Sequence, residues 1–140
     1  MTTHFSGPLA LGAESMPGSA DVGGLSAATT LTVANSNGMT FNLNGGTGFA
    51  ITLPAATQGW RCKFFIGAVF STDFVFTAAA TGTLEGMILE AGAVQTIAAA
   101  DTITLEDGVE NVGDWFEFWS DGTTIFVTGM TLTALSVTPA

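Results

Sequence analysis

The chain is poor in charge, and above all in positive charge. Only 10% of its 140 residues are charged, against about 25% in an average soluble domain. Arg61 and Lys63 are the only basic residues beside 12 acidic ones, so the formal net charge is −10. Two cations cannot neutralise a run of phosphates, and the negative field repels nucleic acids and acidic membranes alike. We therefore expect neither nucleic acid nor a membrane as a partner.

Long apolar runs and cysteine pairs are also lacking. The longest apolar stretch, residues 64–70, is far shorter than the roughly 20 residues of a membrane-spanning helix. The first residues have neither the basic region nor the apolar region of a signal peptide. Cys62 is the only cysteine, which excludes an intrachain disulfide and a thiolate metal cluster. These absences favour a single domain that folds in a reducing cytoplasm.

Side chains that could carry out catalysis are scarce. His4 is the only histidine, and it falls in a segment without regular structure, so a nucleophile has no evident base beside it. Cys62 alternates with Arg61 and Lys63 along a strand-like run, so the cations point away from its thiol. We therefore expect a buried, inert thiol, no enzyme activity and no cofactor.

One acidic cluster leaves two interpretations open. Its members fall close together in the sequence: Glu106, Asp107, Glu110 and Asp114. Carboxylates ligate Ca²⁺, but this spacing is not that of a calcium-binding loop between two helices. The other interpretation, which we prefer, is a solvated acidic loop. Sugar hydrolysis by paired carboxylates would also need an aromatic-lined cleft, for which Trp115 and Trp119 are the only nearby support.

Residues 1–26 differ from the rest of the chain. Gly, Ser and Pro dominate them, no periodicity persists, and a few apolar residues are widely spaced: Phe5, Leu9, Leu11 and Met16. Such a segment gains little by lying on its own domain and orders mainly by docking on a partner. We predict an extended N-terminal arm over residues 1–26.

From residue 27 onward the pattern is that of β-structure. Short alternating runs are rich in Thr, β-branched and aromatic residues, and no window shows an amphipathic helix. The runs are 29–33, 39–43, 49–53, 60–69, 73–77, 83–89, 94–97, 102–105, 115–119, 124–128 and 132–137. Turn pairs that favour hairpins separate several of them: Asn37-Gly38, Asn44-Gly45, Asp107-Gly108 and Asp121-Gly122. We predict an all-β domain over residues 27–140, an antiparallel β-sandwich or jelly roll.

The run 115–119 bears on which surface meets a partner. Alternation places Phe116 and Phe118 on one face and Trp115, Glu117 and Trp119 on the other. If the two Phe side chains face the core, two Trp side chains lie at the surface, as is typical of an interface. The alternative is a strand buried on both faces, with Glu117 paired to a cation.

Three segments carry a resemblance to a known group of proteins. Residues 113–129 form a Gly-Asp, strand, Ser-Asp-Gly, strand pattern that resembles a hairpin near the C-terminus of β-rich structural proteins of tailed bacteriophages. Residues 49–55 with 59–65 resemble a paired segment of the same proteins, and residues 3–9 are similar to the start of many small virion proteins. The aromatic residue usual in the last hairpin strand is Phe126 here.

The resemblance implies a head decoration (cement) protein that binds the outer surface of an assembled capsid and has no catalytic residues. Such proteins commonly form trimers and are made in the host cytoplasm. We therefore expect a homotrimer whose partner is the major capsid protein, kept apart before assembly by its net charge. The expected contact residues are His4, Phe5, Pro8, Leu9, Leu11, Arg61, Lys63, Trp115 and Trp119.

Two other functions remain open at this stage. One is a head-fibre or tail-fibre module that binds host glycans. The other is a carbohydrate-binding β-sandwich with Trp60, Trp115 or Trp119 as a platform on which sugar rings stack.

Overall fold

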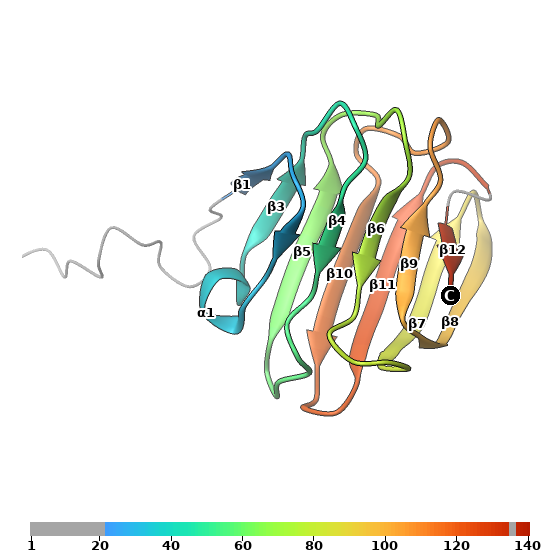
Figure 1. The fold of residues 1–140 in the computed structure, drawn as a ribbon. Helices are drawn as coiled ribbons and strands as arrows, with labels where there is room; N and C mark the ends of the chain where they lie inside the picture. The colour runs from blue at the N-terminus through green and yellow to red at the C-terminus, as the bar shows by residue number, and fades with distance from the viewer. Residues whose placement is uncertain (1–21, 135–136) are drawn as a thin grey trace, which may run out of the picture.

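Two β-sheets packed face to face make up the protein (Figure 1), as seen in a computed structural model that describes residues 22–134 and 137–140. The seven-stranded sheet has the order β1 (Val22–Leu25), β3 (Thr40–Leu43), β5 (Arg61–Ile66), β10 (Trp115–Ser120), β11 (Ile125–Thr131), β7 (Leu84–Glu90) and β8 (Ala93–Ala100). The five-stranded sheet has the order β12 (Val137–Pro139), β9 (Thr102–Leu105), β6 (Phe74–Thr77), β4 (Ala50–Thr52) and β2 (Thr29–Thr30). The predicted all-β sandwich is therefore confirmed.

The first six strands alternate between the two sheets. β1, β3 and β5 lie in the large sheet, whereas β2, β4 and β6 lie in the small one, and neighbours within each set are parallel. Parallel neighbours need a crossover, and here each crossover contains a strand of the opposite sheet. Both sheets are therefore mixed rather than antiparallel, and the jelly-roll form of the prediction is not confirmed.

Because successive strands alternate between the two sheets, most of the predicted turn pairs do not join neighbouring strands of one sheet. Gly38, Gly108 and Gly122 have the positive φ that the pattern predicts. However, only Asp121-Gly122 closes a hairpin between neighbouring strands, β10 and β11. Asn37-Gly38 joins α1 (Val33–Ser36) to β3, and Asn44-Gly45 leads from one sheet to the other. Asp107-Gly108 likewise leads from β9 in the small sheet to β10 in the large sheet. The prediction of hairpins at these three positions is wrong, because a turn residue fixes local backbone shape but not the strand that follows.

Phenylalanine side chains join the two sheets in the core. Phe64 and Phe118 of the large sheet and Phe76 of the small sheet are completely buried. The Phe76 ring centroid lies 4.9 Å from that of Phe64 and 4.9 Å from that of Phe118. Phe116 is buried beside them, so the Phe side chains of β10 do face the core. The interpretation that leaves its Trp side chains on the outer face is confirmed.

One predicted strand is largely replaced by a turn of helix. The strand predicted at 29–33 is only β2, because Thr32 caps α1 instead. The Thr32 Oγ1 accepts from the Asn35 N–H at 3.2 Å, and the Asn35 Oδ1 accepts from the Thr32 N–H at 2.8 Å. These local hydrogen bonds occupy backbone groups that would otherwise need partners on a neighbouring strand. Trp60 then fixes the helix by donating its Nε1–H to the Ser36 Oγ at 3.0 Å.

The two ends of the domain also differ in detail from the prediction. Residues 132–134 are not a strand, and β12 is the short strand that pairs with β9. Four residues assigned to the arm form β1, which pairs in parallel with β3. The rest of the predicted arm, residues 1–21, lies outside the described residues. Within the described part of the chain, no helix has the length and apolar character needed to cross a membrane.

Candidate protein-docking face

The outer side of the seven-stranded sheet carries a row of apolar side chains. Cross-strand register places one residue from each of five neighbouring strands side by side: Phe65, Trp115, Met130, Leu89 and Val94. Leu89, Met130 and Val94 are 40%, 47% and 63% exposed. We call these five residues the apolar row. Monomeric proteins seldom leave contiguous apolar side chains in water, so the row has the character of an interface.

An aromatic pair lies on the same side of the sheet, four residues away from the apolar row along the strands. Trp119 stacks on Phe126, with ring centroids 5.8 Å apart and planes 25° apart. Trp119 keeps 41% of its surface exposed. Lys63, Glu117, Thr128 and other side chains separate this pair from the apolar row. We call this whole outer side, from β3 to β8, the docking face.

Both basic residues of the chain lie on the docking face. Lys63 is directly opposite Glu117, and its Nζ lies 4.6 Å from the ring centroid of Trp115. Arg61 is exposed, and together with Lys63 it lines a shallow pocket of about 170 Å³. Glu85 and Glu117 offset these two cations, so the face is close to neutral on a chain of net charge −10. A second acidic protein surface therefore meets little direct repulsion there.

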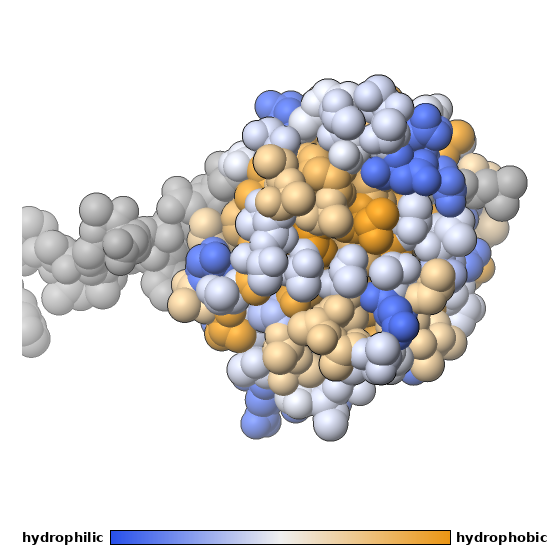
Figure 2. Space-filling model, in the orientation of Figure 1, coloured by the Kyte–Doolittle hydropathy of each residue, from blue (hydrophilic) through white to orange (hydrophobic). Residues whose placement is uncertain are grey.

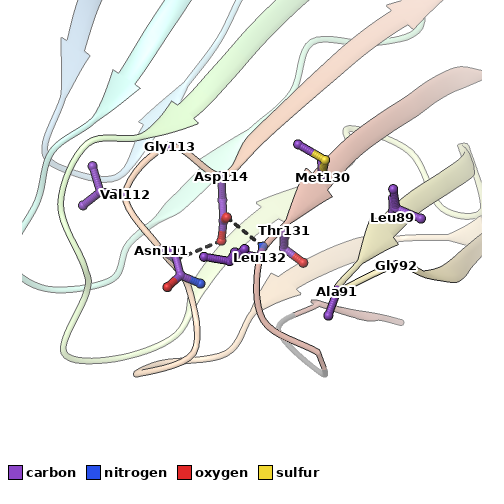
Figure 3. Close-up of a pocket in the computed structure, with 10 residues that line it drawn as sticks. All are labelled: Leu89, Ala91, Gly92, Asn111, Val112, Gly113, Asp114, Met130, Thr131 and Leu132. Atoms are coloured by element: carbon purple, nitrogen blue, oxygen red, sulfur yellow. Dashed lines mark hydrogen bonds between the residues drawn. The ribbon is translucent and has the colours of Figure 1, made fainter.

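A larger pocket of about 370 Å³ lies where β7 and β11 end, beside the apolar row (Figure 3). Leu89 and Met130 line one side, and Val112 and Leu132 line the other, 66% and 74% exposed. Asp114 lies between them with its carboxylate directed at the backbone (Figure 3). Because the carboxylate oxygens of Asp114 already accept backbone N–H groups, the pocket offers a partner mainly apolar walls. Such walls suit an apolar side chain.

Two members of the acidic cluster are buried and bonded to the backbone, and one of them, Asp114, lines this pocket. Asp114 is buried and accepts two backbone N–H groups, from Asn111 at 2.8 Å and from Leu132 at 3.0 Å. Glu110 is buried as well and accepts the N–H of Phe70 at 2.5 Å.

The solvated-loop interpretation is therefore wrong for Glu110 and Asp114, since each residue is buried and its carboxylate accepts a backbone N–H group. Asp107 is exposed, as predicted, and Glu106 is half-buried. Among the described residues, no group of His, Cys, Asp and Glu is arranged to hold a metal ion.

Two side chains considered for chemistry or binding are enclosed in the core. Cys62 is buried, as predicted, and burial raises the pKa of its thiol to about 12, so little reactive thiolate forms near neutral pH. Trp60 is 1% exposed and bonded to Ser36. The hypothesis that Trp60 forms a sugar-stacking platform is therefore wrong, because no ligand can reach its ring.

The opposite side of the sandwich has a different chemistry. In Figure 2, which views the five-stranded sheet, this side is mostly pale and tan, with some orange atoms near its centre and blue atoms towards its rim. Cross-strand register aligns a row of threonines there: Thr30, Thr52, Thr77 and Thr102. No large exposed apolar side chain lies on the described strands of this sheet. The contrast marks the docking face as the surface more suited to meeting protein.

Four of the contact residues predicted from the sequence come together on the docking face, namely Arg61, Lys63, Trp115 and Trp119. The predicted contacts in the arm lie outside the described residues: His4, Phe5, Pro8, Leu9 and Leu11. The sequence interpretation missed Met87, Leu89, Val94 and Met130, and also the pocket. Alternation along β7 and β11 was the available signal, because Leu89 and Met130 each lie next in sequence to an inward-facing residue.

No protein-family model matches the chain, and no match was found among curated proteins or among solved structures.

Proposed function

We propose that this chain is a structural subunit without enzymatic activity that binds another protein through its docking face. The observation that carries the proposal is the outer side of the seven-stranded sheet, where an apolar row, an exposed aromatic pair and both basic residues of the chain occur together. The single histidine and the enclosed thiol of Cys62 support a role without chemistry.

More specifically, the proposed partner is the major capsid protein of a tailed bacteriophage, and the chain is a decoration protein on the outer surface of the assembled head. The support is the resemblance carried by residues 113–129, which include β10 and β11. These strands lie at the centre of the docking face. The segment that resembles virion proteins is thus the same segment that presents Trp115, Trp119 and Met130.

The docking face would stabilise a shell by burying apolar surface against it and not by catalysing a reaction. Burying the apolar row and the Trp119–Phe126 pair removes apolar surface from water. The pocket beside Leu132 takes an apolar side chain, and Arg61 and Lys63 meet carboxylates of the partner. Anything that binds only the assembled shell shifts the equilibrium towards assembly. A homotrimer would add to this effect, because three faces bound at one site act together.

The Trp119→Ala variant tests the docking face. The exposed 41% of the indole corresponds to about 100 Å² of a surface near 250 Å². At about 25 cal/mol per Å² this amounts to about 2.5 kcal/mol, or about 60-fold weaker binding. Binding is measured by co-sedimentation with purified heads that lack the protein. Val75→Ala on the small sheet is the matched control and should bind as the unmodified chain does. Equal binding by both variants would overturn the assignment.

The Trp119–Phe126 stack also favours a second candidate function, a module that binds host glycans from a fibre or a sugar-binding sandwich. An exposed aromatic platform is how proteins hold sugar rings. A glycan array with the whole chain separates the two functions. Glycan binding that is lost in Trp119→Ala supports the module, whereas no glycan binding together with head binding supports decoration.

A further inference from the structure

The seven-stranded sheet ends in an edge strand that has a bulge near its C-terminal end, where Ala99 has φ +47°, and is regular over residues 93–97. β8 is its last strand, and among the described residues no strand pairs with the far side of β8. Eight residues long, β8 contains no charged residue and no proline, and most of its side chains are exposed. Proteins usually block such edges with charge, proline or a covering segment, because unpaired N–H and C=O groups attract another strand. The backbone groups on this side of β8 are therefore available to pair with a further strand, and the described part of the chain does not provide one.

The part of the chain outside the described residues contains a matching segment. Residues 2–6 alternate Thr, His and Ser with Thr and Phe, carry no acidic residue, and are followed by Pro8. This composition suits an added edge strand, and proline ends it. We propose that residues 2–6 of a neighbouring copy pair with β8, so that copies of this chain join head to tail.

The position of β1 favours a neighbouring copy over the same chain. β1 and β8 form opposite edges of one sheet, which at about 4.8 Å per strand are about 29 Å apart. The residues before β1 would have to cross the whole docking face to reach their own β8. In a head-to-tail arrangement the β8 of the neighbour lies next to β1 instead, and the loop to be closed is shorter. Heterologous contacts form a ring when the rotation between copies closes and a filament when it does not; a ring of three agrees with the trimer proposed above.

The side chains of β8 favour the same pairing. Val94 ends the apolar row at this edge and is the most exposed member of the row. Phe5 on an added strand would extend the row by one more apolar side chain if it took the outer side. Since β8 and residues 2–6 are both free of acidic residues, two chains of net charge −10 could pair there without direct carboxylate repulsion.

Light scattering and amide exchange on the full chain, without any capsid, test the inference. The mass should be about three times 14.2 kDa at micromolar concentration. The amides of β8 that point away from β7 should exchange slowly, like those that bond to β7. In Thr3→Pro with Phe5→Pro, which removes two backbone donors, the mass should fall to that of one chain and these amides should exchange at least about tenfold faster. Prolines at Ala13 and Ser15 are the matched control and should leave both readouts unchanged.

A second pair of variants alters the edge itself. Thr96→Lys places a charge on β8, whereas Thr30→Lys makes the same change on β2, an edge strand of the other sheet. Only the first should lower the mass. The inference is overturned by a dimer that survives the arm prolines, which would indicate pairing of β8 with β8. It is also overturned by a monomer with protected β8 amides, which would indicate the chain's own arm, or by rapid exchange of β8 in the unmodified chain. Because no capsid is present, these results do not depend on decoration.

Discussion

Asp114→Asn is the substitution whose effect follows most directly from the structure. Asp114 is 5% exposed, and its carboxylate accepts two backbone N–H groups, one from Asn111 and one from Leu132. It therefore joins the loop before β10 to the residue that follows β11. An asparagine keeps the shape of the side chain but has one oxygen and one NH₂ group, so one N–H must face another donor.

The loss of one hydrogen bond to a charged acceptor costs about 1.5–3 kcal/mol, and a buried unpaired donor adds to that loss. We therefore expect the free energy of unfolding to fall by about 2–3 kcal/mol. Urea unfolding at pH 7, followed by Trp fluorescence, measures the change, and the denaturant slope should stay the same.

Asp107→Asn provides the matched control, because Asp107 belongs to the same acidic cluster but is exposed. Its effect should stay within about 0.5 kcal/mol. If Asp114→Asn were as stable as the Asp107 control, the buried carboxylate would not hold the loop, and the account of the pocket would be wrong. The loosened pocket wall should also weaken head binding by Asp114→Asn.

Three further predictions concern the backbone, the thiol and a turn. An added Cβ at Gly86 would lie 2.0 Å from the Val127 carbonyl oxygen, where φ is +145°, so Gly86→Ala should cost about 3 kcal/mol or more in urea unfolding. Gly59→Ala, with φ +81° but open space, should cost only about 1 kcal/mol, and equal losses would refute the clash. With a pKa of about 12 instead of 9.0, Cys62 should react with a thiol reagent about a thousandfold more slowly in the folded chain than in urea, and rapid labelling of the folded chain would contradict its burial. The backbone N–H groups of Thr124 and Thr123 lower the pKa of Asp121 below 3.8, so its stabilisation is present above pH 3.8 and is lost as the pH falls through the lowered pKa; Asp121→Asn should remove this part of the acid dependence, and an unchanged acid profile would argue against it.

Much of the fold follows from alternation along single strands. The pattern of 115–119 correctly places Phe116 and Phe118 inside and the two Trp side chains outside, because burial of one face determines the orientation of every second residue. The same reasoning correctly encloses Cys62 while leaving Arg61 and Lys63 on the outer side. Such predictions need only the alternation of side chains along one strand and the side on which the core lies. The local sequence is sufficient for them.

Features that depend on distant partners were not predictable in this way. The alternation of β1 to β6 between the sheets depends on which strands pair. The sequence of a single strand does not specify its partner. The capping box at Thr32 competes with a strand pattern of similar length, and the hydrogen bonds within residues 32–35 decide the outcome. In the sequence, Glu110 and Asp114 resemble surface carboxylates. Only in the folded chain do the N–H groups of Phe70 and Leu132 lie beside them as hydrogen-bond donors.

The most direct test of the central claim is a density map, at side-chain resolution, of a phage head that carries this protein. The account predicts density for the two-sheet fold on the outer surface of the shell, with Trp119, Met130 and the pocket at Leu132 against the major capsid protein and the threonine row of the small sheet towards solvent. Density that places the docking face in solvent, or that places the chain on a fibre or tail instead of the head, would contradict it.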